Sequence, residues 1–234
     1  VASSYLAYGG SLQVVRAGGT NLKNAFVGTA SSIKIDSLTD YNTKGYDETT
    51  ITGVSFAARN PGSWGNGLKV AIIDAKADQE IGIGGTVLAD PVTAIGVGVT
   101  QAIPAGTVIA GAGSTSLLDG YLKGIITGIT TATGLIEVKV LDHISAAGTR
   151  TEVDYTPQGV YKFNTSEDIT VQGVGATTVN TAKDWFDQQE FTLTGETNLK
   201  RKWSTVAPRP GTSDYAAARG ARFDEVHIVV IDAE

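Results

Sequence analysis

The chain has 234 residues, of which 41% are hydrophobic and 18% are charged, and its formal net charge is −6. This is a globular composition, long enough to bury a core without disulfides or metal ions, and it excludes a disordered or supercharged chain. The longest basic cluster is Lys200-Arg201-Lys202, which argues against a nucleic-acid partner, and the absence of Cys excludes disulfide scaffolds, zinc–thiolate sites and cysteine nucleophiles.

The first elements in chain order are a helix end and a short strand. Residues 1–8 predict the last turns of a helix closed by Gly9-Gly10, and residues 12–17 predict a strand. A second apolar run at 54–58 and a glycine-rich turn lead into a strand at 68–73. The sequence contains no Met, and the first helix lacks its start, so we expect an internal piece of a longer protein.

Residues 78 to about 174 are rich in Gly, Thr, Val, Ile and Ala, which is typical of an all-β module. The expected strands are 92–99, 107–110, 124–130 and 135–141. In the last of these, Glu137 and Lys139 fall on alternate positions, so we expect one face in solvent and the other packed.

The C-terminal part of the sequence, from about residue 180, predicts both short helices and strands. Thr181 to Asp184 resembles a capping box, and Ala182, Trp185, Phe186 and Gln189 share one side of a helix, with Trp185 expected in the core. The remaining expected elements are extended segments at 191–193 and 203–207, a short helix at 215–218 capped by Ser213 or Asp214, and a buried closing strand at 226–231.

The sequence contains near misses to known reactive motifs. Gly62 to Lys69 looks like a phosphate-binding loop, but Leu68 stands at the lysine position and the strand follows the glycines, so a turn that enters a strand is the better interpretation. His143 and His227 have no His or acidic partner at ligand spacing, which argues against a metal site or a catalytic triad.

Carboxylates and tryptophans also give no site. The adjacent pairs Asp47-Glu48, Glu167-Asp168 and Asp224-Glu225 point to opposite faces of a strand, so solvated loop charges are favoured over a glycosidase pair. Trp64 lies in a turn, where it is a loop anchor or an interface contact. We therefore predict no catalytic residue, no cofactor-binding residue and no metal ligand, and no run of about 20 apolar residues that could span a membrane.

Several segments in chain order carry a family resemblance. They include Asn60-Pro61-Gly62 with Trp64, and Pro208-Arg209-Pro210-Gly211. The full segments are residues 2–17 with 22–25, 56–70 with 72–75, 184–189, and 203–213 with 224–230. Together they resemble the tail sheath protein of contractile bacteriophages of the T-even and cyanophage type, that is, of myoviruses.

The resemblance implies a structural subunit without enzymatic activity. Its partners would be neighbouring sheath subunits in stacked hexameric rings, the tail tube protein, the baseplate and the tail terminator. It would be assembled in the bacterial host cytoplasm and would reside in the phage tail of the virion. Contraction of the sheath would drive the tube through the host envelope for genome ejection, which requires contacts with two alternative geometries.

The resemblance also suggests a domain organisation. The fold class that we expect is α+β, mainly β: a mixed sheet with a few short helices in a sheath core segment over 1–77 and 178–234. An inserted all-β, barrel- or sandwich-like module over 78–177 would face outward. In some relatives the outward domain is inserted just after the strand that corresponds to 12–17, and here the β-rich addition follows Asp74 instead.

Other functions remain open at this point. Within the same class, the chain could be the sheath of a phage-tail-like bacteriocin or of another contractile injection system. From another class, a β-rich glycan-binding adhesin or a capsid decoration protein would share this composition. A hydrolase is the weakest alternative, because the sequence offers no nucleophile with a matching base.

Overall fold

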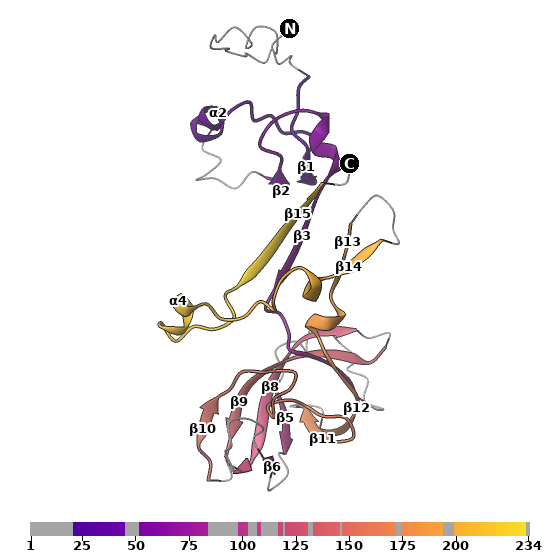
Figure 1. Ribbon diagram of the computed structural model, residues 1–234, viewed down its shortest axis with the longest axis vertical. Helices are drawn as coiled ribbons and strands as arrows, with labels where there is room; N and C mark the ends of the chain where they lie inside the picture. The colour runs from indigo at the N-terminus through magenta and orange to yellow at the C-terminus, as the bar shows by residue number, and fades with distance from the viewer. Residues whose placement is uncertain are drawn as a thin grey trace, which may run out of the picture. The chain divides into compact units, whose positions relative to one another are not determined.

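The computed structural model describes residues 21–44, 52–83, 98–102, 107–108, 117–118, 120–130, 133–145, 147–171, 175–193 and 199–232. The described part is mainly β, with several antiparallel sheets and few short helices (Figure 1). This confirms the mainly-β class. The expected helix at 1–8, the strand at 12–17 and most of the strand at 92–99 lie outside the described residues.

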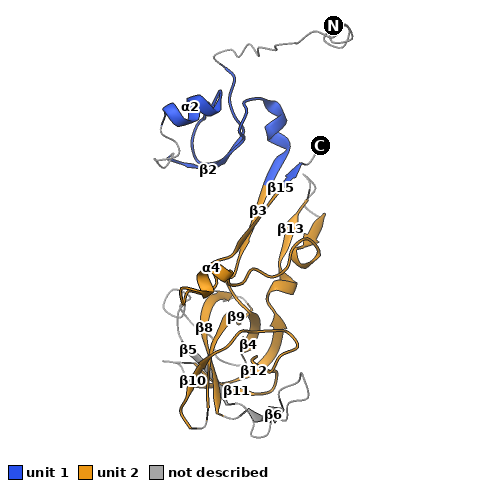
Figure 2. Cartoon of the chain, turned by 60° about the vertical axis from the view of Figure 1, so that its left-hand side comes forward, with its two compact units in different colours: residues 1–69, 230–234 blue, residues 70–229 orange. Residues whose placement is uncertain are grey.

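The chain divides into two compact units, residues 1–69 with 230–234 and residues 70–229 (Figure 2). In the first unit, β1 (Phe26–Gly28) pairs antiparallel with β2 (Val54–Ala57). This unit also contains α2 (Leu38–Thr43) and the 3₁₀ helix η1 (Ser63–Gly67). Buried Asn24 holds two of its segments together, since its side chain accepts a hydrogen bond from Ile35 N at 2.7 Å and donates one to Ala58 O at 2.7 Å.

A separate two-stranded sheet consists of β3 (Leu68–Asp74) and β15 (Val226–Asp232). The strands expected at 54–58, 68–73 and 226–231 are thus confirmed. Among the described residues, β2 and β3 belong to different two-stranded sheets rather than to one mixed sheet.

The second unit contains a seven-stranded antiparallel sheet with the order β10-β9-β4-β12-β11-β5-β8. An additional antiparallel pairing joins β8 to β9. The bounds are β4 (Gln79–Ile83), β5 (Gly98–Ala102), β8 (Tyr121–Thr130), β9 (Leu135–Ile144), β10 (Arg150–Glu152), β11 (Asp168–Val171) and β12 (Gly175–Asp184). The short strands β6 (Thr107–Val108) and β7 (Leu117–Leu118) form a ladder of their own.

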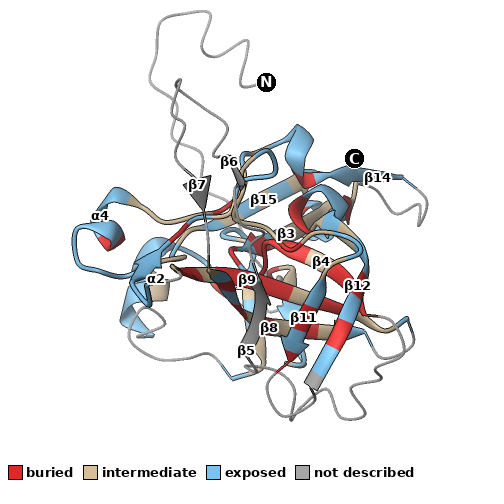
Figure 3. Ribbon diagram, turned by 90° about the horizontal axis from the view of Figure 1, so that it is seen from below, coloured by how far each residue is buried: buried red, intermediate tan, exposed pale blue. Residues whose placement is uncertain are grey.

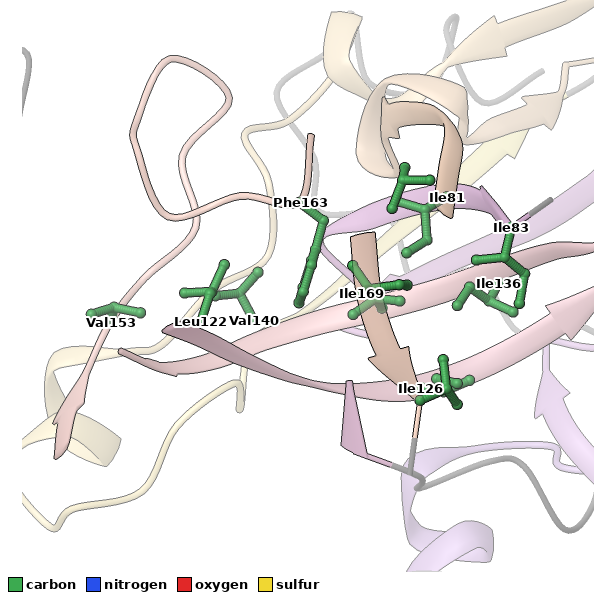
Figure 4. Close-up of a cluster of buried hydrophobic side chains, with 12 residues drawn as sticks. Ile81, Ile83, Leu122, Ile126, Ile136, Val140, Val153, Phe163 and Ile169 are labelled. Atoms are coloured by element: carbon green, nitrogen blue, oxygen red, sulfur yellow. The ribbon is translucent and has the colours of Figure 1, made fainter. Parts of the chain in front are cut away.

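Figure 3 marks the buried residues of this sheet, and Figure 4 draws the side chains of the main hydrophobic core, which lie on one face of the sheet. Strand β8 shows why, because Leu122 and Ile126 are buried while Tyr121 and Lys123 are exposed, as the two-residue period of a strand requires. The cluster contains Ile81, Ile83, Leu122, Ile126, Ile136, Val138, Val140, Val153, Phe163, Ile169, Val171 and Val179.

Phe163 enters this core from a loop, and its backbone is fixed by a buried glutamine. The side chain of Gln79 donates to Phe163 O at 2.9 Å and accepts from Phe163 N at 2.7 Å. The ring packs above Gly124, where an added Cβ would lie 3.0 Å from it. The glycine therefore makes room for the largest fully buried side chain among the described residues.

The prediction that one face of the strand at 135–141 lies in solvent is wrong. Lys139 is only 6% exposed, and Glu137 is half-buried, where its carboxylate accepts a hydrogen bond from Trp185 Nε1 at 3.0 Å. Both faces of β9 are covered because chain segments from outside the sheet pack over the charged side. The alternation was a sound signal for a strand, but not for exposure.

The prediction of a short helix around Trp185, within residues 181–189, is also wrong. Strand β12 continues to Asp184, and only a 3₁₀ turn, η2 (Phe186–Gln188), follows. The end of β12 pairs with β4, and these ladder bonds outweigh a weak helical pattern. Trp185 is buried as expected.

The remaining C-terminal elements are short. The segment expected at 191–193 corresponds to β13 (Glu190–Thr192), which pairs with β14 (Lys200–Lys202). The extended segment expected at 203–207 is instead the 3₁₀ helix η3 (Trp203–Thr205). The short helix is confirmed as α4 (Asp214–Ala217), with Ser213 as its N-cap, because Ser213 Oγ accepts from Ala216 N at 3.2 Å.

Candidate interaction surface

The exposed apolar residues of β15 form the clearest candidate surface. Val226, Ile228 and Val230 alternate along the strand and are 53%, 56% and 62% exposed. The strand expected at 226–231 is present, but the prediction that it is buried is wrong. Strand β15 pairs only with β3 among the described strands, and no described segment covers its even-numbered side chains. Ile72 on β3 is also exposed.

This strand offers a partner two kinds of contact. Its second edge has backbone N–H and C=O groups that no described strand pairs, and such an edge can accept a further strand. Its aliphatic row can bury apolar area against another surface. Both kinds of contact are characteristic of protein interfaces rather than of small-molecule sites.

The carboxylate pair before β15 has a structural role. Asp224 accepts hydrogen bonds from the backbone N–H and the hydroxyl of Ser213 at 2.8 and 2.6 Å, and these bonds lower the pKa of Asp224. Glu225 accepts from Gly211 N at 2.7 Å. The two carboxylates therefore fix the 211–213 loop, and they do not face each other across a cleft.

The other candidate residues from the sequence are dispersed. His143 lies on β9 with its ring 6.0 Å from that of Tyr161, whereas His227 lies on β15. Gly62 precedes η1, which leads directly into β3, as expected for a turn that enters a strand. Trp64 is exposed, and Asp47-Glu48 lies outside the described residues.

The remaining acidic pair is placed by local contacts. Glu167 accepts from Asn164 Nδ2 at 3.2 Å, and Asp168 accepts from Thr178 Oγ1 at 2.8 Å. Within the described ranges, no group of three or more His, Asp or Glu side chains could hold a metal ion. No helix in those ranges is long and apolar enough to cross a membrane.

No protein-family model, curated protein or solved structure matches the chain.

The sequence did not reveal a partly buried polar cluster at the end of β12. Asp184 accepts from Tyr155 OH at 3.1 Å and forms an ion pair with Arg209, whose guanidinium lies 5.2 Å from the centre of the Tyr155 ring. Burial, followed by the Asp184 charge, raises the pKa of Tyr155. Arg209 stands between Pro208 and Pro210, so the cluster anchors this rigid segment to the sheet.

A pocket of about 380 Å³ is lined by Glu152 and Asp154, by residues at and after the end of α4, and by Thr212 and Arg222. The guanidinium of Arg222 is already bound to Asp154, at 2.8 Å. We assign no ligand to this pocket. It leaves open space beside the turn that follows α4.

Proposed function

We propose that the chain is part of a structural subunit of a phage contractile tail sheath, which polymerises as stacked hexameric rings around the tail tube. The observation that carries the proposal is the exposed aliphatic row of β15. The same strand closes the last segment of the resemblance, so the sequence signal and the exposed surface coincide. A subunit that works through protein contacts needs such a surface, and heterologous contacts between copies produce rings and helical polymers.

The ends of the seven-stranded sheet support the further proposal that its strands belong to an inserted module, which would then run over 79–184 rather than over the expected 78–177. Gln79 at the start of β4 lies opposite Asp184 at the end of β12, and Trp185 N donates to Asp78 O at 3.0 Å. The chain therefore enters and leaves the module at adjacent points. Adjacent ends are the geometry that allows one domain to be inserted into another. We propose that this module decorates the outer surface of the sheath.

Immunogold electron microscopy of the natural source tests the proposal. Antibodies raised against this chain should label tubes in both the extended and the contracted state, along their whole length. Label on phage-tail-like particles without capsids would select a bacteriocin or injection-system sheath. Label restricted to capsids, or to soluble monomers that bind sugars, would overturn the proposal in favour of a decoration protein or an adhesin.

A further inference from the structure

Lys139 contacts both chain connections that join the β3–β15 sheet to the seven-stranded sheet. Its ammonium group donates a hydrogen bond to Ala75 O, directly after β3. The same group lies 3.6 Å from the centre of the Phe223 ring, in the segment that leads into β15. One buried lysine on β9 thus binds the outgoing and the returning chain at once.

Neighbouring groups strengthen the attachment of both connections. Asp78 donates its N–H to Val138 O at 2.9 Å and accepts from Val140 N at 2.8 Å, so it binds β9 on either side of Lys139. Arg222 donates to Leu141 O at 3.1 Å and to Val153 O at 2.7 Å. Its guanidinium also lies 4.5 Å from the Phe223 ring centre.

The returning connection is held in a strained backbone conformation. Phe223 has a φ of 63°, in the left-handed region that bulky residues rarely occupy. Its N–H donates to Thr212 Oγ1 at 2.9 Å, while its ring contacts the two cations. Such a conformation persists only while the surrounding contacts hold it, and it favours a different backbone state once they are lost.

We propose that Lys139 acts as a releasable clamp: when its contacts with Ala75 and Phe223 are lost, the described contacts that still bond residues 211–225 to β9 are those of Arg222, and this segment with α4 moves away from β9 more often while the seven-stranded sheet stays folded. The pocket between Glu152 and Ala217 leaves space beside the moving segment. The core of the sheet does not include residues 211–225, so their release leaves the hydrophobic cluster intact.

The clamp depends on the charge of Lys139. The charged groups that act on it are Asp78, Asp74, Arg222 and Arg209. Burial lowers the pKa of Lys139, and the two carboxylates oppose this only in part. An increase in pH therefore discharges Lys139 earlier than an exposed lysine, and the neutral amine loses its attraction to the Phe223 ring.

The test is hydrogen exchange of the full chain with Lys139→Met, which removes the charge and keeps an apolar stem. The amide of Phe223 should exchange about tenfold faster, because Phe223 then leaves the left-handed conformation in which its N–H donates to Thr212 Oγ1. Those of β8 and of β9 away from Lys139 should keep their protection. Lys123→Met, on the exposed face of β8, is the matched control and should behave as the wild type. Unchanged exchange at Phe223, or an equal loss of protection in β8, would overturn the clamp.

A second measurement remains informative if Lys139→Met fails to fold. The chain has no Cys, so spin labels on Thr151→Cys and Ala218→Cys report the separation of β10 and the α4 turn alone. In the wild type, a longer distance should appear as the pH is raised to about 10, whereas Lys139→Arg stays charged and should keep the shorter one. The proposal is contradicted if the distance between the two spin labels does not change with pH in the wild type, or if it changes equally in Lys139→Arg.

Discussion

Asp78 is a buried carboxylate, and burial dominates its ionisation. Desolvation raises the pKa of Asp78 above its ordinary value of 3.8, although Val140 N–H and Lys139 favour the charged form. In the window above pH 3.8, the folded chain therefore retains a proton that the unfolded chain has lost. The stability that Asp78 contributes is fully present below this window and is lost as the pH rises through the raised pKa.

We predict that Asp78→Asn gains stability relative to the wild type as the pH rises through this window. The neutral amide avoids the cost of ionisation, and its oxygen can still accept from Val140 N. Urea unfolding at a series of pH values measures the difference. Asp168→Asn, which alters an exposed carboxylate bonded to Thr178, serves as the control and should show no such trend. A difference between Asp78→Asn and the wild type that is constant with pH would contradict the prediction.

At the same scale, Lys139 and Glu137 show what the sequence could not predict. Their alternation with Ile136 and Val138 indicated a strand correctly, because strand period is a local property. Their burial depends on Ala75, Phe223 and Trp185, which are distant in sequence and are brought together only by the tertiary fold. No local pattern contains that information.

At the scale of elements, the sequence pattern predicted a helix both around Trp185 and at α4, and only the prediction at α4 was correct. The Ser213 cap of α4 was predictable, because a cap acts on residues three positions away. The helical spacing around Trp185 failed because the preceding residues of β12, up to Asp184, pair with β4. This extended pairing overrides a helix propensity of a few tenths of a kcal/mol per residue, as such propensities typically are.

Two glycines with similar backbone angles allow a matched test of the turns. Gly120 and Gly148 have φ values of +87° and +84°, but a Cβ on Gly120 would lie 1.9 Å from Ile144 O, whereas one on Gly148 would meet nothing within 4 Å. Gly148→Ala should cost about 1 kcal/mol, the price of a left-handed alanine. Gly120→Ala should cost about 3 kcal/mol or more, because the backbone must also shift. Equal losses in urea unfolding would show that the close approach has no energetic effect.

The aliphatic row of β15 gives a prediction about assembly. Substitution of Val226, Ile228 and Val230 by Ser should change the free energy of unfolding by about 1 kcal/mol or less per site, because these side chains are already half exposed. Under the proposed sheath function, incorporation of the chain into tubes in the natural source should be lost, which electron microscopy and sedimentation would detect. Leu38→Ser, at an exposed apolar position on α2, is the control. Normal tubes from the triple variant would show that the aliphatic row of β15 is not the assembly interface.

At the scale of the whole molecule, the inserted-module proposal can be tested by deletion. Replacing residues 79–184 with a short Gly–Ser linker joins Asp78 to Trp185, which already contact each other. Tails should still assemble, and they should be thinner in outline by electron microscopy. Deletion of β15 should abolish assembly and serves as the contrasting variant. Loss of tails on removal of 79–184 would mean that these strands belong to the assembling core.

The pairing of β4 with β12 also sets an order for folding during synthesis. Strands β8 and β9 are close in sequence and can pair soon after they leave the ribosome, but β4 has no partner on its other side until residue 184 has emerged. For that interval the apolar side chains of Ile81 and Ile83 lack part of their final cover. Long-range pairing of this kind slows folding and exposes strands to aggregation. We therefore expect the yield of native protein to depend on elongation rate and chaperones, a constraint that the finished structure no longer displays.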